Sequence, residues 1–361
     1  MRFVDEFRDA EHVRALAARI GEAARRLERP VRFMEVCGGH TMAIHRFGIP
    51  DLLPDAVELL SGPGCPVCVT PTAYIDRAAE LAGGGATVPP FGDLFRVPGA
   101  GGTLEQAGAR GADVRIVYSP RDALKTAREN PDGDVVFLAV GFETTAPAVA
   151  ATVLEADAAG VENFRVLSGH KTMPGALRCL LEAPEVGLDG FILPGHVATV
   201  TGVGPFEFIP GEFALPCSIT GFEPGDILTS ILSLTEQCAR GEARVDNRYG
   251  RAVRSEGNPK ARAVVEQVFK PSDAQWRGVG MIEGSGLDLR EEWAAFHAEP
   301  PDPHAASDQP PGCRCGEVLR GLVRPPECAL FGERCTPETP VGPCMVSSEG
   351  SCAAHYKYGT A

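Results

Sequence analysis

The sequence predicts an α/β protein with two parallel-sheet units and a smaller C-terminal unit of irregular structure. Short apolar runs alternate with helical patterns between residues 31 and 240, and the last fifty residues are irregular and rich in cysteine. Strands that alternate with helices form parallel sheets with right-handed crossovers. The alternating region is about 210 residues long, which favours two α/β units over one.

The first expected element is an amphipathic helix. Residues 5–28 have helical periodicity that ends before Pro30, so we assign residues 1–30 to an N-terminal helix. The candidate strands are Arg32–Val36, Val57–Ser61, Val114–Tyr118, Val135–Val140, Phe164–Leu167, Gly190–Leu193 and Cys217–Thr220. The helical patterns that follow several of them are Pro71–Ala82, Arg121–Glu129, Ala146–Ala159, Met173–Glu182 and Pro224–Ala239.

We expect domain boundaries at three places. The first α/β domain covers residues 31–113, with a break near the Gly-rich stretch 82–102, and the second covers residues 114–240. The alternation fades after residue 241, so residues 241–361 form a C-terminal domain. Its Pro-rich stretch 299–311 has the composition of an exposed linker.

Composition and charge exclude several classes of protein. The formal net charge of −14 argues against a nucleic-acid binder, which needs a basic face. No stretch is long and apolar enough for a membrane helix, and the N-terminal residues lack the apolar run of a secretory signal. We therefore expect a cytoplasmic protein with neither membrane nor nucleic-acid partners, in which the 12 cysteines are metal ligands or redox thiols rather than disulfides.

The C-terminal tail, residues 311–361, concentrates half of these cysteines in Gly- and Pro-rich loops. They are Cys313, Cys315, Cys328, Cys335, Cys344 and Cys352. Thiolates select Zn²⁺, Cu(I) or Fe–S clusters, and zinc sites usually show Cys-x2-Cys pairs, which the tail lacks. Widely spaced cysteines favour an iron–sulfur cluster, with structural zinc as the alternative. The separate cysteines Cys179, Cys217 and Cys238 are interpreted as small buried hydrophobes.

Two further cysteine motifs lie near the front of the chain. Cys65 and Cys68 form a Cys-x-x-Cys motif between a strand and a helix, where a helix N-terminus lowers thiol pKa values and favours dithiol–disulfide exchange. Half of a zinc site is the alternative. Cys37 and His40 stand in a Cys-Gly-Gly-His turn after a strand. The two glycines leave the Cys37 thiolate sterically open, so it could bind a metal-bearing ligand beside His40. The same pair also fits a Cys/His hydrolase.

Polar residues also follow three other strands. Glu143 with Thr144 and Thr145, His170, and His196 each stand in a Gly-containing turn at a strand end. Ligands bind outside the carboxyl ends of strands in open α/β sheets, so these turns and Cys37 are expected to converge and supply hydrogen bonds or proton transfer. Helix capping is an equally good interpretation of the two threonines.

Taken together, the motifs Met-Glu-Val-Cys-Gly-Gly-His-Thr, Ser-Gly-Pro-Gly-Cys-Pro-Val-Cys, Gly-Phe-Glu-Thr-Thr-Ala-Pro, Leu-Pro-Gly-His-Val and Cys-Met-Val-Ser-Ser-Glu-Gly-Ser-Cys resemble the HypD family of [NiFe]-hydrogenase maturation proteins. The resemblance runs from about residue 30 to the C-terminus. It implies two similar α/β domains and a third domain with a [4Fe–4S] cluster. It also implies a complex with a HypC-like chaperone that carries iron while CN and CO ligands are installed, with cyanide from a HypE-like donor that works with HypF. The finished Fe(CN)2CO unit would then pass to the hydrogenase large subunit.

The resemblance assigns roles to individual residues. Cys37 matches the cysteine proposed to hold the iron, and Cys65 with Cys68 matches a redox-active thiol pair. The cluster ligands match Cys315, Cys328, Cys335 and Cys352, with Cys344 as the alternative ligand and Cys313 as a less certain member. Family members often have a second histidine where this chain has Met42, so we infer that this histidine is not essential.

Two other functions remain open from the sequence. One is a cluster-dependent thiol–disulfide oxidoreductase that reduces an external substrate through Cys65 and Cys68 and does not need Cys37. The other is a Cys/His hydrolase with a structural zinc tail. We favour a redox-active assembly scaffold over a conventional turnover enzyme.

Overall fold

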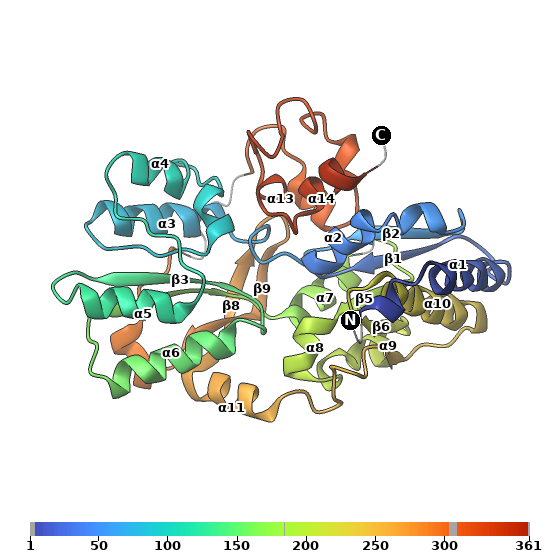
Figure 1. The fold of residues 1–361 in the computed structure, drawn as a ribbon, viewed down its shortest axis with the longest axis horizontal. Helices are drawn as coiled ribbons and strands as arrows, with labels where there is room; N and C mark the ends of the chain where they lie inside the picture. Colours follow the sequence, from blue (N-terminus) through green and yellow to red (C-terminus); the bar gives the residue numbers. More distant parts are fainter. Residues whose placement is uncertain (1–3, 184, 303–308, 360–361) are drawn as a thin grey trace.

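The computed structural model describes residues 4–183, 185–302 and 309–359. Two parallel sheets stand in separate lobes, and the C-terminal tail lies at the top of the view above their junction (Figure 1). The larger sheet has the strand order β2-β1-β5-β6-β7, and every neighbouring pair in it is parallel. Its strands are β1 (Val31–Glu35), β2 (Val57–Ser61), β5 (Gly190–Pro194), β6 (Cys217–Thr220) and β7 (Val245–Asn247).

The smaller sheet pairs β3 (Val135–Gly141) with β4 (Phe164–His170), again in parallel. At its edge, isolated bridges join residue 87 to residue 135, residue 88 to residue 114, and residue 91 to residue 117. The predicted strand Val114–Tyr118 is therefore wrong: it forms only single bridges, and Ile116 and Tyr118 are 45% and 90% exposed.

The helices follow the strands as expected for an α/β protein, which confirms the predicted fold class. The helices are α1 (Ala10–Ala24), α2 (Gly38–Arg46), α3 (Thr72–Gly83), α4 (Leu104–Ala109), α5 (Pro120–Glu129), α6 (Ala146–Ala158), α7 (Met173–Glu182), α8 (Gly195–Thr201), α9 (Phe208–Phe213), α10 (Pro224–Arg240), α11 (Pro259–Val268), α12 (Cys315–Leu319), α13 (Pro343–Val346) and α14 (Ser351–Tyr358). Short 3-10 turns occupy Asp5–Phe7, Pro50–Leu52, Gly92–Arg96, Gly204–Phe206, Glu291–Phe296 and Pro325–Glu327.

The chain passes from the larger sheet to the smaller one and back. β1 and β2 belong to the larger sheet, β3 and β4 form the smaller one, and β5 to β7 complete the larger sheet. Each lobe therefore has its own apolar core, and the larger one combines segments that are far apart in the sequence. The larger sheet takes strands from both sides of the smaller one in the sequence, so it does not define boundaries along the chain. The domain boundaries expected from the sequence therefore stay a prediction.

A β-hairpin joins the smaller lobe to the tail. β8 (Phe269–Trp276) and β9 (Gly280–Leu289) pair in antiparallel fashion, and β9 packs against β4 and α7. The expected linker 299–311 lies beyond this hairpin, and its residues 303–308 lie outside the described residues. The tail that follows has only short helices, as its composition predicts.

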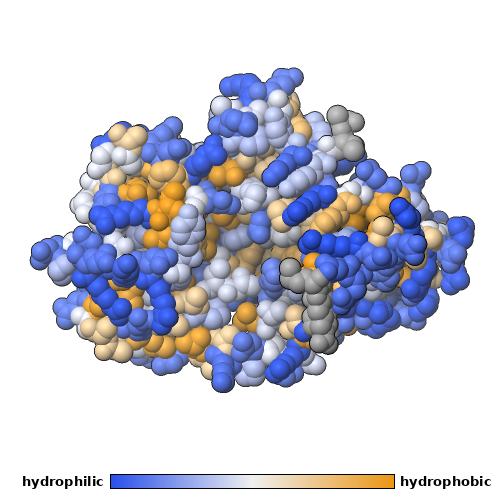
Figure 2. All heavy atoms as spheres, in the orientation of Figure 1, coloured by the Kyte–Doolittle hydropathy of each residue, from blue (hydrophilic) through white to orange (hydrophobic). Residues whose placement is uncertain are grey.

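The surface is mainly polar on the face shown in Figure 2, and apolar side chains appear there only in patches over the lobes. Among the described residues, no helix is both long enough and apolar enough to span a membrane. The N-terminal helix α1 packs on α10 beside the larger sheet, where Leu16 and Ile20 are buried.

Candidate metal and thiol site

Cys37 stands at the carboxyl end of β1, where it is the N-terminal cap residue of α2. The loop after β2 packs directly on this turn: the Gly38 N–H donates to the Gly64 carbonyl at 2.9 Å. A Cβ atom on Gly64 would lie 2.1 Å from the Cys37 backbone nitrogen, so only glycine permits this approach. The two cysteine motifs predicted at neighbouring strand ends are thus joined through backbone contact.

Two glutamates lie near Cys37. The Cys37 N–H donates to Glu35 Oε2 at 3.0 Å, and the Thr41 hydroxyl donates to Glu35 Oε1 at 2.6 Å. Glu349, from the tail, lies against Gly38, where a Cβ atom would be 2.6 Å from Glu349 Cβ. Burial, followed by the charge of Glu349, raises the pKa of Cys37 to about 12, and burial raises the pKa of Glu35 to about 7. The thiol is therefore protonated until a cation offsets the negative charge around it.

His40 is fully buried behind Cys37 and stacks on Phe222. The two rings are 4.5 Å apart, and Phe222 also stacks on His196 with a ring separation of 4.0 Å. His40 Nε2 is 3.0 Å from the Gly221 carbonyl, which assigns the ring proton to Nε2, while Nδ1 is buried without a partner. Burial lowers the pKa of His40 to about 4, so the ring is neutral. The structure thus brings Cys37, His40 and His196 together at one sheet edge.

Glu143 and His170 lie apart from this group, at the ends of β3 and β4 in the smaller sheet. Glu143 Oε1 accepts a hydrogen bond from the Met173 N–H at 2.8 Å, and the His170 ring contacts Phe269 at 5.3 Å. Within the described part of the chain, neither residue has a hydrogen bond or ring contact with Cys37. Their expected participation at the Cys37 site stays a prediction.

Cys65 and Cys68 occupy the loop between β2 and α3, and both are buried. The Cys68 N–H donates to Cys65 Sγ at 3.4 Å, so the two cysteines are in direct contact. The prediction that a helix N-terminus lowers the pKa of the Cys68 thiol is wrong, because α3 begins only at Thr72. A hydrogen bond with Cys344 favours the Cys68 thiolate, but the hydrogen bond with Cys65 and burial outweigh it and raise the pKa of Cys68 well above its ordinary value.

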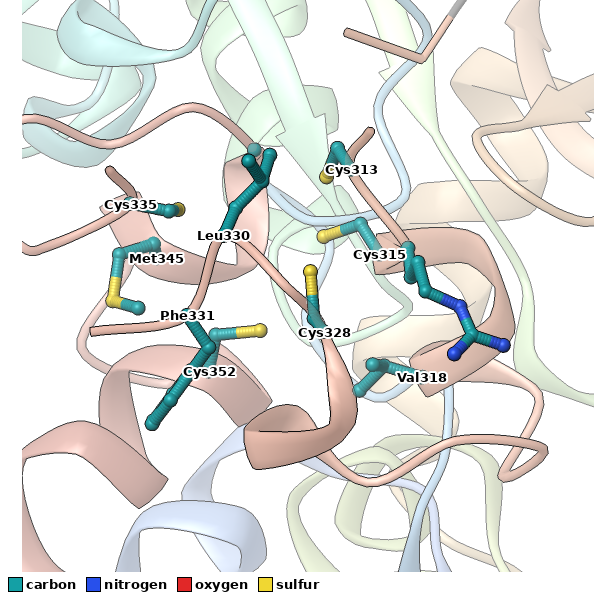
Figure 3. Close-up of a pocket in the computed structure, with 11 residues that line it drawn as sticks. Cys313, Cys315, Val318, Cys328, Leu330, Phe331, Cys335, Met345 and Cys352 are labelled. Atoms are coloured by element: carbon teal, nitrogen blue, oxygen red, sulfur yellow. The ribbon is translucent and has the colours of Figure 1, made fainter. Parts of the chain in front are cut away.

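The tail folds its cysteines around one small cavity. Figure 3 shows the sulfur atoms of Cys313, Cys315, Cys328, Cys335 and Cys352 pointing into a common space between α12 and α14. The cysteines that line the cavity are Cys313, Cys315, Cys328, Cys335 and Cys352, so all four predicted cluster ligands are together. Leu330, Phe331 and Met345 complete an apolar wall around them. Cys344, the alternative ligand, is fully buried but does not line this cavity.

The donor set of the tail cavity fits an iron–sulfur cluster. Its five thiols are soft ligands of the kind that hold iron–sulfur clusters, and the rest of the lining is apolar side chains, Gly342 and Arg314, with no carboxylate or imidazole. Among the described residues, no three His, Cys, Asp or Glu side chains lie close enough together to bind one metal ion.

Cys344 connects the two cysteine groups. Its N–H donates to Cys315 Sγ at 3.3 Å, and its thiol lies close enough to those of Cys315, Cys352 and Cys68 for them to shift its pKa. Cys68 Sγ also approaches the Pro343 carbonyl at 3.8 Å. A continuous series of thiols therefore runs from Cys65 through Cys68 and Cys344 to the tail cavity.

The sequence did not single out three residues of this arrangement. Glu35 stands two positions before Cys37, and this short spacing was the one available signal. Glu349 stands inside the quoted tail motif but was given no role, and Phe222 has no local signal because it meets His40 from more than 180 positions away in the chain.

Comparison with known proteins covers nearly the whole chain. A family model named HypD, described as the hydrogenase formation hypA family, matches residues 11–359. The hydrogenase maturation factor HypD of Escherichia coli (strain K12) is 48% identical over 367 residues, with 99% of this chain and 98% of that protein covered. The hydrogenase maturation factor HypD of Rhodobacter capsulatus is 44% identical over 373 residues, with 100% and 99% covered. The hydrogenase expression/formation protein HupD of Azotobacter chroococcum mcd 1 is 47% identical, with 99% and 97% covered.

Proposed function

This chain belongs to the HypD family, and from that premise we propose that it is a [NiFe]-hydrogenase maturation factor that holds iron at Cys37 while CN and CO ligands are installed. The observation that carries the proposal is the series of contacts that joins three cysteine groups. Cys37 touches the loop of Cys65 and Cys68, and Cys68 reaches the tail cavity through Cys344.

Electrostatics at Cys37 favours a cation as cargo. The thiol stands beside Glu35 and Glu349, and two carboxylates disfavour an isolated thiolate. An arriving Fe²⁺ offsets these negative charges, so that Cys37 can release its proton and bind the iron. The neutral His40, held by the Gly221 carbonyl and Phe222, fixes the wall of the site behind the thiol.

The tail and the thiol pair supply the redox function. Cys315, Cys328, Cys335 and Cys352 would hold a [4Fe–4S] cluster, which provides electrons one at a time when bound. Cys65 and Cys68 take two electrons and two protons when their disulfide opens to two thiols. Cys344, which contacts both groups, is assigned the role of the connecting thiol.

The partners proposed are those that the family resemblance implies. A HypC-like chaperone would supply the second thiolate to the iron, and a HypE-like donor working with HypF would deliver cyanide. The hydrogenase large subunit would receive the Fe(CN)2CO unit. We place these steps in the cytoplasm.

A second candidate function is a cluster-dependent thiol–disulfide oxidoreductase. The contact between Cys68 and Cys344 favours it, because an electron path from the tail to the dithiol is all that such an enzyme requires. Cys37 separates the two functions, since the oxidoreductase does not use it.

The test replaces one thiol of the pair. We expect Cys68→Ser to abolish hydrogenase maturation in cells that lack their own factor, because the dithiol can no longer form. Cys179→Ser is the matched control, since this half-buried cysteine of α7 takes no part in the thiol series. Normal hydrogenase activity with Cys68→Ser would remove the dithiol from the mechanism.

A further inference from the structure

Arg277 is buried at the tip of the β8–β9 hairpin, between the loop of Cys68 and the tail. The residue is 0% exposed, and its Nε–H donates to the Thr70 carbonyl at 2.6 Å. Its Nη2 donates to the Pro98 carbonyl at 3.2 Å, and its backbone N–H donates to the Val69 carbonyl at 2.9 Å. The guanidinium is therefore fixed by backbone carbonyls rather than by an acidic side chain.

No ion pair between Arg277 and a carboxylate is found among the described residues, and its Nη1 is buried without any acceptor. A buried charge without a counter-charge is costly, and natural proteins rarely leave one. Burial lowers the pKa of Arg277, and the neighbouring thiols Cys315, Cys344, Cys313 and Cys68 oppose that shift. Those thiols span both ends of the connection between the tail cavity and the dithiol.

The hairpin tip is built to hold Arg277 at this place. Gly278 has a φ of +77°, and a Cβ atom there would lie 2.2 Å from Cα of Gly316 in the cysteine-bearing segment. A glycine at each position lets the two backbones touch. Trp276, the residue before Arg277, is fully buried and fixes the other side of the tip through a 2.8 Å hydrogen bond to Ser285.

We propose that Arg277 is a positioning residue that supplies the counter-charge for the tail redox centre and thereby makes its reduction more favourable. The inference rests on the proposed function, because it takes the tail cysteines to hold a cluster. One-electron reduction by an external one-electron donor adds one negative charge to the centre without adding a proton. A fixed cation nearby stabilises the reduced state more than the oxidised state.

The experiment measures the reduction midpoint of the cluster in anaerobically purified full-length protein, with dithionite as the electron donor. Arg277→Gln keeps the size of the side chain and removes the charge. We expect its equilibrium constant for reduction to fall about tenfold or more, a shift of about 59 mV to lower potential. Arg277→Lys keeps the charge and is expected to stay near the wild-type midpoint.

The control is Arg290→Gln, at the other end of the same hairpin, where the side chain donates to the Glu266 carbonyl. It is expected to leave the midpoint unchanged. If Arg277→Gln takes up no cluster while Arg277→Lys does, the requirement for charge is supported, because assembly of an anionic cluster then depends on the cation.

Three results would overturn the inference: an unchanged midpoint in Arg277→Gln, a shift in Arg277→Lys as large as in Arg277→Gln, or loss of the cluster from both folded variants. The last two would show that the shape of arginine matters rather than its charge. A wild-type protein that contains no iron or sulfide would instead refute the cluster assignment itself, so failure of the inference and failure of the proposed function give different results.

Discussion

Gly64→Ala tests whether the thiol pair must touch the Cys37 turn. The added Cβ would lie 2.1 Å from the Cys37 nitrogen, 2.4 Å from the Val36 carbonyl carbon and 2.5 Å from the Cys37 Cα. All three neighbours are backbone atoms, so no side-chain rotation can relieve the clash. Ordinary contact begins at 3.4 Å, and the loop must therefore move by about 1.3 Å.

This displacement has two expected consequences of different size. Overpacking of this kind costs about 1–3 kcal/mol of stability, which a protein of this size tolerates. A misplacement of about 1 Å at a reacting centre costs about a hundredfold in rate. We therefore expect Gly64→Ala to fold, to keep its metal content, and to lower the rate of hydrogenase maturation about a hundredfold.

The assay compares hydrogenase activity in cells that lack their own factor with the thermal unfolding of the purified variant. Gly83→Ala is the matched control, because a Cβ at the end of α3 meets nothing within 4 Å. If Gly64→Ala matures hydrogenase at the rate of Gly83→Ala while remaining folded, contact between the loop and Cys37 is not required and the reasoning is wrong.

Two further predictions concern the tail and the buried carboxyl of the smaller lobe. Cys335→Ser removes a thiol that lines the cavity, and the purified variant should lose iron and sulfide. Cys344→Ser should retain both and lose only electron transfer to the dithiol. Equal loss of iron and sulfide in the two variants would instead make Cys344 a ligand. Burial raises the pKa of Glu143 to about 7, so the folded state keeps a proton that the unfolded state releases above about pH 4.5. The free energy of unfolding should therefore fall by about 3 kcal/mol between pH 4.5 and pH 7 because of this group. Urea unfolding measured across this pH range should show that Glu143→Gln lacks this decrease. A variant whose free energy of unfolding falls as steeply with pH as that of the wild type would contradict the prediction.

The strands of both sheets were predictable wherever a run is apolar throughout. β3 and β5 are buried at every position, and their runs stand out in the sequence. The β8–β9 hairpin was missed because its burial is irregular and its strands contain Gly, Pro and charged residues. Residues 114–118 have the apolar pattern of a strand but lie at an edge, where only isolated bridges form.

The cysteines of the site were predictable because thiols at turns and in Gly/Pro loops carry a chemical signal of their own. Their surroundings were not. Arg277 looks like a surface residue in the sequence, yet the hairpin buries it among thiols more than 200 positions earlier and up to about 70 positions later. Such neighbours follow from the tertiary fold and leave no local pattern.

The most direct test of the central claim is infrared spectroscopy of the anaerobically purified complex with its maturation partners, together with iron and sulfide analysis. Iron held at Cys37 predicts more iron than the cluster alone accounts for, with absorption bands of bound cyanide and carbon monoxide. Cys37→Ala should lose those bands and keep the cluster iron, since the tail cavity does not involve Cys37. Bands that persist in Cys37→Ala would contradict the assignment of the iron to this thiol.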